Sequence, residues 1–154
     1  MKVYLAGFIN GNKIEQCSEW RKRIVTHYLL KAWDIIWLDP MNGKAITTLT
    51  PDGLHSEYPI RAIVDRDVKC LEDADLVVAN LDTFGETRAP TGTLCEISIT
   101  GYIHKPLIVI TNDPNYYNHP WIQDFASITV PSVDELLEKK YIDYFYKGTV
   151  NTRY

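Results

Sequence analysis

The sequence contains little cysteine, and its histidines are scattered. Only 3 of its 154 residues are cysteine, at positions 17, 70 and 95, and no pair has the Cys-x-x-Cys spacing. Neither a disulfide framework nor a zinc site is indicated, and we interpret the cysteines as buried small hydrophobic residues. The 4 histidines include no i, i+4 pair of the kind that binds metal on a helix. We therefore expect no metal and no cofactor.

The chain also lacks an excess of positive charge and a long apolar run. Its formal net charge is −4, which offers no basic surface to a nucleic-acid backbone, so a polymer substrate is excluded. The N-terminal "MKVYLAGFIN" is too short an apolar stretch for a signal peptide, and no later run reaches membrane-spanning length. We expect a cytosolic protein that forms one domain over residues 1–154.

Apolar segments of strand length alternate with helical patterns along the chain. The expected strands are residues 2–7, 33–39, 75–82, 106–111 and 127–130. The expected helices, with apolar residues at intervals of three and four, are residues 13–31, 60–74, 92–104 and 132–147. Ser132 and Glu135 form a candidate capping box for the last helix.

This alternation predicts an α/β fold with a doubly wound, three-layer, flavodoxin-like arrangement around a five-stranded, mostly parallel sheet. Ligands of such folds bind beyond the carboxyl ends of the strands, which gives weight to residues 7–12, 39–43, 82–92 and 111–119. Residues 41–59 are polar, turn-rich and long for a connection. They are typical of a loop that covers a substrate, with disorder as the alternative.

Several residues in these regions are candidates for chemistry, and each has a structural alternative. The "GFINGN" segment at 7–12 offers amides to an anion, but it also suits a tight turn between a strand and a helix. Glu96 is expected near a helix N-terminus, where the helix dipole favours an anionic nucleophile, or where it serves only as a solvated helix-start acid. Asp67 lies in a run of acids that is typical of a solvated helix face. Asp82 ends a strand, as a ligand-binding carboxylate or as a turn residue.

The chain resembles the nucleoside 2-deoxyribosyltransferase family from "VYLAG" to "FYKGTV". The resemblance rests on a first strand that carries Tyr4, on "RDVKCLEDADLVVANLD", and on "GTLCEI" followed by "KPLIVI". It implies that Glu96 is the nucleophile, that Asp67 is the active-site aspartate, and that Tyr4 orients the nucleophile through a hydrogen bond. It also implies a homo-oligomer in which the C-terminal segment reaches a neighbouring subunit's active site, although "NTRY" here extends beyond the usual end.

The loop before Glu96 departs from the family pattern. Family members often carry an acid there that contacts the nucleobase, whereas this chain has Ala89, Pro90 and Thr91, and Asp82 or Glu86 is a possible substitute. We expect substrate to be bound by residues at the strand ends and at the start of the third expected helix, namely Gly7, Phe8, Asp82, Gly92 and Thr93.

The expected reaction is the transfer of 2-deoxyribose between nucleobases through a covalent deoxyribosyl-Glu96, with Asp67 as proton donor. The partners would be 2'-deoxyribonucleosides and free nucleobases, with no membrane. One alternative is hydrolysis of a deoxynucleoside 5'-monophosphate through the same intermediate. That branch shares the "RD" and "ADLVVA" features, but this chain lacks its Ser/Gly-rich run before the glutamate. A second alternative is a non-catalytic nucleotide-binding module, because a fold alone does not fix function.

Overall fold

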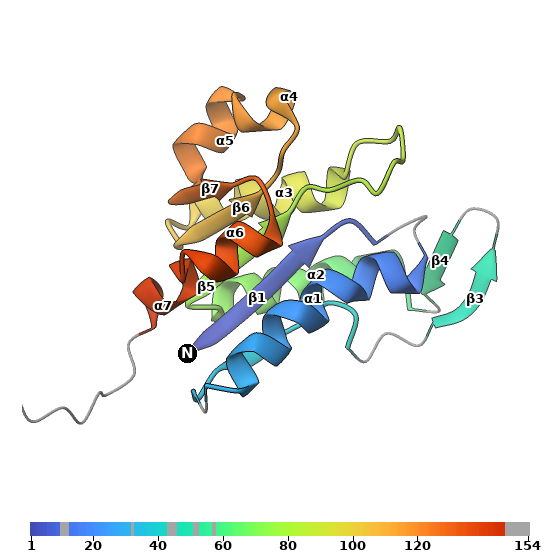
Figure 1. Cartoon of the computed structure of the whole chain (residues 1–154). Helices are drawn as coiled ribbons and strands as arrows, with labels where there is room; N and C mark the ends of the chain where they lie inside the picture. Colours follow the sequence, from blue (N-terminus) through green and yellow to red (C-terminus); the bar gives the residue numbers. More distant parts are fainter. Residues whose placement is uncertain (10–12, 32, 43–45, 51–52, 57, 147–154) are drawn as a thin grey trace, which may run out of the picture.

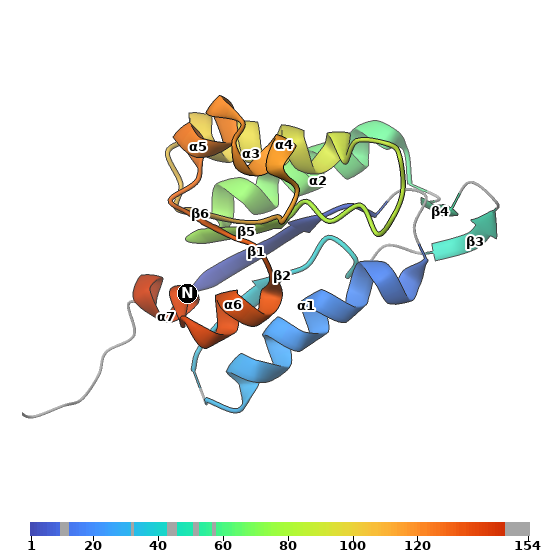
Figure 2. The ribbon, with the colours of Figure 1, turned by 45° about the horizontal axis from the view of Figure 1, so that its top comes forward.

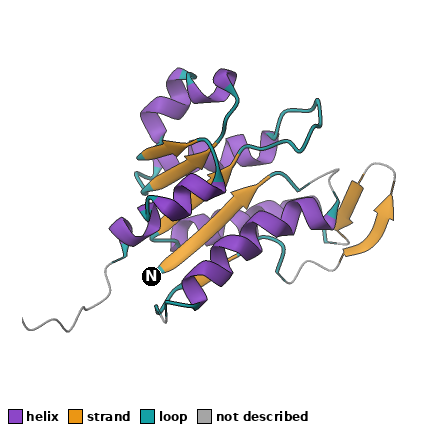
Figure 3. Cartoon of the chain, viewed as in Figure 1, coloured by secondary structure: helices purple, strands orange, loops and turns teal. Residues whose placement is uncertain are grey.

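The described chain forms a five-stranded sheet and a two-stranded hairpin. The hairpin lies apart from the main sheet, at the right of Figures 1 and 3. A computed structural model describes residues 1–9, 13–31, 33–42, 46–50, 53–56 and 58–146. The strands of the main sheet are β1 (Lys2–Gly7), β2 (Ile36–Leu38), β5 (Leu76–Asn80), β6 (Leu107–Ile110) and β7 (Ile128–Val130). They are ordered β2-β1-β5-β6-β7, and every neighbouring pair is parallel.

This order confirms the predicted flavodoxin-like doubly wound fold, and the sheet is entirely parallel. Each expected strand is present. The second is shorter than its apolar segment predicted, because only Ile36–Leu38 of residues 33–39 pairs with β1.

The helices lie in two layers, one on each face of the sheet (Figure 2). They are α1 (Ile14–Leu29), α2 (Ile60–Asp73), α3 (Thr91–Tyr102), α4 (Pro114–Tyr117), α5 (Pro120–Phe125), α6 (Val133–Glu138) and α7 (Tyr141–Phe145). Alternate residues of β1 enter two separate cores: Val3 and Leu5 pack with α1, α6 and α7, whereas Tyr4 and Ala6 pack with α2, α3 and α5. Both faces of β1 are therefore buried, as its continuous apolar sequence requires.

The last helical segment is broken, although its pattern predicted one helix over residues 132–147. Ser132 caps α6, since its Oγ accepts a hydrogen bond from the Glu135 amide at 3.2 Å, which is the first of the two hydrogen bonds of the expected capping box. Lys140 then adopts a left-handed conformation, with φ of 56°, which ends one helix and starts the next. Apolar periodicity alone does not show such a break, because α7 continues to bury Ile142 in the same core.

Residues 41–59 contain an antiparallel hairpin of β3 (Ile46–Thr50) and β4 (Gly53–Ser56), where we expected a loop. The short helices α4 and α5 were also not expected. Each has a proline at its start, a position that proline favours because its missing N–H has no partner there in any case. Among the described residues, no helix is long and apolar enough to cross a membrane.

Candidate active site

A cavity of about 950 Å³ opens beside the carboxyl end of β1, between α2 and the N-terminal part of α3. Its lining is mostly apolar and includes three charged side chains, Asp67, Arg88 and Glu96. The other lining residues are Gly7, Phe8, Ile9, Pro40, Met41, Tyr58, Ile60, Ile63, Val64, Val68, Leu71, Ala89, Thr91, Gly92, Thr93, Cys95 and Ile99. An apolar cleft with a few convergent polar groups is the usual form of a small-molecule site.

Tyr4 and Glu96 are joined at this cavity by a short hydrogen bond. The Tyr4 hydroxyl donates to Glu96 Oε1 at 2.6 Å, across 92 residues of sequence. Burial, followed by the negative charges of Glu96 and Asp67, raises the pKa of Tyr4 far above its usual value. The phenol therefore remains neutral and acts as a donor, which fixes one oxygen of the carboxylate.

Glu96 lies in the second turn of α3, because it is the sixth residue of Thr91–Tyr102. The first turn of this helix contains no acidic residue. The dipole effect that was expected to act on Glu96 decays within the first turn, so it contributes less here than the sequence indicated. The hydrogen bond from the Tyr4 hydroxyl stabilises the Glu96 carboxylate instead. Glu96 is half-buried and lines the cavity, unlike a solvated helix-start acid.

Asp67 lies on the apolar face of α2, not on its solvated face. The cavity-lining residues Ile60, Ile63, Val64, Val68 and Leu71 share this face with it. Neighbouring acids such as Asp65 and Glu72 are exposed instead. Asp67 thus belongs to the same cavity as Glu96, and its charge acts on Tyr4 together with that of Glu96. Helical spacing from Ile60 places Asp67 in this stripe, which is the signal that the interpretation as a solvated face overlooked.

The structure brings most of the expected substrate-binding residues to this cavity. Gly7, Phe8, Gly92 and Thr93 all line it. Asp82 is absent from the described lining, and its carboxylate accepts a hydrogen bond from the Phe84 amide at 2.8 Å within a turn. A ligand role for Asp82 stays a prediction. Residues 10–12 of the "GFINGN" segment lie outside the described part of the chain.

Two arginines at the site were not singled out from the sequence. Arg88 lines the cavity with its guanidinium 5.9 Å from the centre of the Phe8 ring, and it pairs with Glu86 at 3.7 Å. It lies within residues 82–92, the strand-end loop that the fold rule had marked. Arg21 is 1% exposed and lies beneath the end of β1. A single arginine in an amphipathic helix carries no signal of such burial.

The C-terminal aromatic residues pack mainly on their own chain. Tyr146 stacks on Trp33 with ring centres 4.3 Å apart, and Phe145 packs against the core between the sheet and α1. Tyr144 is 83% exposed. Residues 147–154, which include most of the expected subunit-bridging segment, lie outside the described part of the chain.

Solved structures share this fold at low sequence identity. A CMP N-glycosidase from Clostridium botulinum, BcmB, is 16% identical with a TM-score of 0.59, over 95% of this chain and 100% of that one. A conserved protein from Enterococcus faecalis V583 is 18% identical with a TM-score of 0.60, over 90% of this chain and 95% of that one.

A 2-desoxiribosyltransferase from Leishmania mexicana is 18% identical with a TM-score of 0.48, and the match covers 73% of this chain. This chain spans about 65% of the length of that protein. No curated protein matches the sequence significantly.

The sequence as a whole matches one family description. The match to the nucleoside 2-deoxyribosyltransferase family runs over residues 3–144, which takes in Tyr4, Asp67 and Glu96. The chain belongs to the nucleoside 2-deoxyribosyltransferase family.

Proposed function

We propose that the protein transfers 2-deoxyribose from a 2'-deoxyribonucleoside to a second nucleobase through a covalent intermediate on Glu96. The observation that carries this proposal is the 2.6 Å hydrogen bond from the Tyr4 hydroxyl to Glu96 Oε1 at the wall of an apolar cavity that Asp67 also lines. A hydrogen bond of this length orients the carboxylate, and a fixed orientation is what a carboxylate nucleophile requires.

In the first step, a Glu96 carboxylate oxygen attacks the anomeric carbon of the deoxyribose, and the bond from that carbon to the base nitrogen breaks. Because Tyr4 holds Oε1, we assign the attack to Oε2. Asp67 enters this step protonated and donates its proton to the departing base, so the base leaves as a neutral molecule and Asp67 becomes a carboxylate. The product is an ester between Glu96 and the sugar.

In the second step, a ring nitrogen of the incoming base attacks the same carbon and releases the Glu96 carboxylate. The incoming base loses its proton to Asp67, which restores the enzyme. Two displacements at one carbon retain the configuration of the glycosidic bond. Tyr4 stabilises the carboxylate as it is released, since its neutral phenol remains a donor throughout.

The lining of the cavity suits this substrate class in polarity. Nucleobases are flat and largely apolar on their faces, and Phe8, Met41 and Val68 offer matching surface. The two carboxylates and Arg88 are the charged side chains of the described lining, so polar recognition is concentrated at a few positions.

The test is incubation of the protein with deoxyinosine and adenine, followed by chromatography. We expect deoxyadenosine and hypoxanthine in equal amounts, and no exchange with Glu96→Gln. A Glu96→Gln protein that binds base and exchanges at the wild-type rate would contradict the proposal. A wild-type protein that binds these compounds and converts neither would indicate a non-catalytic nucleotide-binding module.

The second candidate is hydrolysis of a nucleoside 5'-monophosphate, with water in place of the incoming base. It is favoured by Arg88, a cation at the cavity whose Glu86 partner is 3.7 Å away and exposed, so a substrate phosphate can replace it. It is also favoured by the fold that the chain shares with a CMP N-glycosidase. Incubation with CMP and dCMP, with and without an added free base, separates the two reactions. Base release that is independent of the added base would assign the hydrolase.

A further inference from the structure

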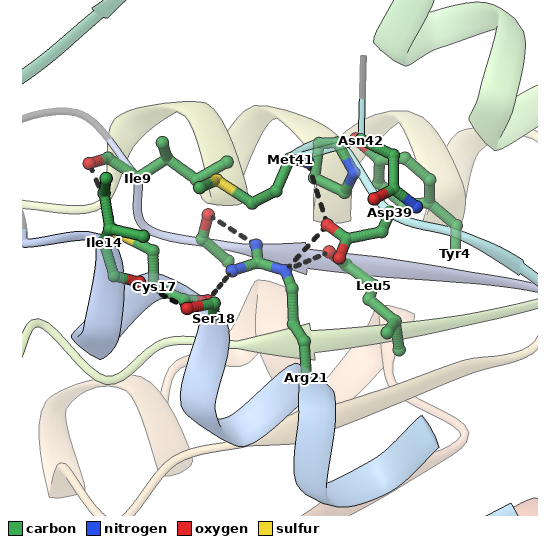
Figure 4. A network of polar contacts seen from close by, with 12 residues as sticks. Tyr4, Leu5, Ile9, Ile14, Cys17, Ser18, Arg21, Asp39, Met41 and Asn42 are labelled. Atoms are coloured by element: carbon green, nitrogen blue, oxygen red, sulfur yellow. Dashed lines mark hydrogen bonds and ion pairs between the residues drawn. The ribbon is translucent and has the colours of Figure 1, made fainter. Parts of the chain in front are cut away.

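The buried side chain of Arg21 is held by four oxygen atoms beneath the candidate active site (Figure 4). Its Nε donates to the Leu5 carbonyl at 3.2 Å, and its Nη2 donates to the Gly7 carbonyl at 3.2 Å. Its Nη1 donates to the carbonyl of Cys17, one turn earlier in α1. The fourth oxygen is Asp39 Oδ1, which lies 3.4 Å from Nε.

These contacts fix the carboxyl end of β1, the strand that carries Tyr4. Leu5 follows Tyr4 directly, and Gly7 lines the cavity. Both carbonyls face a guanidinium whose donors are arranged in a rigid planar fork. The position of the Tyr4 hydroxyl on Glu96 therefore depends on how Arg21 holds the strand.

The same cation reaches a second wall of the cavity through Asp39. The Asp39 carboxylate accepts a hydrogen bond from the Met41 amide at 2.8 Å, and Met41 lines the cavity. From the other side, Arg66 of α2 donates to the carbonyl of Pro40 at 3.3 Å and to that of Asn42. The segment after β2 is thus held between two arginines, of which only Arg21 also contacts β1.

The charge of Arg21 has an electrostatic consequence for the nucleophile. Burial lowers the pKa of Arg21, whereas the negative charges of Asp39 and Glu96 oppose this effect. The guanidinium thus interacts with Glu96 as well as with Asp39. A buried cation interacts more strongly over a given distance than an exposed one, because water does not screen it.

We infer that Arg21 is a positioning residue of the active site, which aligns the Tyr4 end of β1 under Glu96 and places a buried positive charge near the nucleophile. Asp39 partly neutralises this charge. Its hydrogen bond from the Met41 amide also connects Arg21 to the cavity wall. The inference rests on the proposed function, because it assigns to Glu96 the ionised form that attacks the sugar.

Several charged or titratable groups surround the Tyr4–Glu96 pair. They are Asp67 and Cys70 from α2, Arg21 from α1, Asp39 after β2, and Tyr58, Arg88 and Cys95 at the cavity. Arg21 is the cation among them that is fully buried. Its removal leaves the remaining carboxylates to oppose ionisation of Glu96, whereas removal of Asp39 leaves the Arg21 charge uncompensated. The two changes therefore act in opposite directions.

The experiment measures the pH dependence of kcat/KM for base exchange in the wild type and four variants. The acidic limb of this profile reports ionisation of the essential base in the free enzyme. We expect Arg21→Met to move this limb to higher pH by about one unit, and Asp39→Asn to move it to lower pH. Arg21→Lys keeps the charge but loses the fork, so the limb stays near its wild-type position while kcat falls.

Arg66→Met is the matched control, since it removes an arginine that holds the same segment from the other side. We expect it to raise KM without moving the acidic limb. Titration of protein labelled with carbon-13 at the glutamate carboxyl, with the Glu96 signal assigned by its loss in Glu96→Gln, gives the same shifts without turnover. Circular dichroism shows which variants are folded. If Arg21→Met does not fold, Arg21→Lys and Asp39→Asn carry the test.

Three results would overturn the inference: an Arg21→Met limb at the wild-type pH, an Arg21→Lys limb displaced as far as that of Arg21→Met, or an Asp39→Asn limb displaced upward. If Arg21→Met is unfolded, an unmoved Asp39→Asn limb overturns it as well. Failure of the proposed function has a separate signature, in which wild-type protein shows no exchange or Glu96→Gln retains it.

Discussion

At the scale of single residues, the site is defined by a hydrogen bond between a buried phenol and a carboxylate. Tyr4 has no exposed surface, and the negative charges of Glu96 and Asp67 keep its proton in place. A neutral donor next to a carboxylate orients it without neutralising it. A carboxylate that is both oriented and ionised can act as a nucleophile, whereas a solvated acid on a helix has no fixed orientation.

Replacement of Glu96 by alanine removes the carboxylate oxygen that would form the proposed intermediate. We expect base exchange to fall by several powers of ten, because no other group replaces the covalent step. The fold should survive, since Glu96 lines a cavity and is not packed in the core. Exchange kinetics alongside circular dichroism check both statements. Exchange close to the wild-type rate would show that Glu96 is not the nucleophile.

Replacement of Tyr4 by phenylalanine removes one hydrogen bond to a carboxylate and leaves the ring in place. Such a bond contributes about 1.5–3 kcal/mol, so kcat/KM should fall by roughly ten- to a hundred-fold. Because the pKa of Tyr4 is raised, the phenol stays protonated well above pH 10 and the basic limb of the pH profile should not move. A basic limb that disappears in Tyr4→Phe would mean that Tyr4 titrates during turnover.

At the scale of elements, the site depends on how closely α1 approaches the end of β1. Gly7 is the last residue of β1, and a Cβ atom built there would lie 2.7 Å from Cζ2 of Trp20 and 3.1 Å from Nη2 of Arg21. Both neighbours are almost fully buried. Glycine at this position lets the helix pack on the strand and lets Arg21 reach the strand carbonyls.

Gly7→Ala should therefore lower the free energy of unfolding by about 1–3 kcal/mol, the usual range for overpacking. Gly92→Ala is the matched control, since a Cβ atom there would meet no atom within 4 Å. Within α3, that change should leave stability the same or raise it by up to about 1 kcal/mol. Urea unfolding of both variants measures the difference. Equal effects would show that the contact with Trp20 relaxes without cost.

At the scale of the whole molecule, the end of the described part of the chain packs on the rest of the same chain. Asp143 of α7 accepts a hydrogen bond from the Tyr28 hydroxyl at 2.7 Å and pairs with Lys31 at 2.9 Å, and Tyr146 stacks on Trp33. These contacts fix the point at which the C-terminal segment, residues 147–154, begins. We propose a symmetric oligomer in which that segment completes a neighbour's active site.

Deletion of residues 147–154 tests this proposal while it keeps the contacts of α7. We expect exchange activity and oligomer mass to fall together, since the active site and the interface share the segment. Light scattering and exchange kinetics measure the two effects, and thermal unfolding at high protein concentration controls for the fold. A truncated chain that is fully active and monomeric, like an equally monomeric full-length chain, would exclude shared sites.

The sequence by itself determined the class of fold and the position of the candidate nucleophile. Continuous apolar strands alternating with amphipathic helices specify a parallel sheet covered on both faces, because burial on two faces leaves no polar side of a strand.

Only the tertiary structure decided which of these residues meet. Tyr4 and Glu96 are 92 residues apart, Asp67 shares the cavity face of α2, and Arg21 is buried under β1. The sequence pattern likewise did not predict the hairpin of β3 and β4 or the break between α6 and α7 at Lys140. Local sequence patterns indicate the type of an element and its buried face. Which side chains come together at a site depends on strand order, on register and on how closely helices approach strands. Packing between segments that are distant in sequence sets all three.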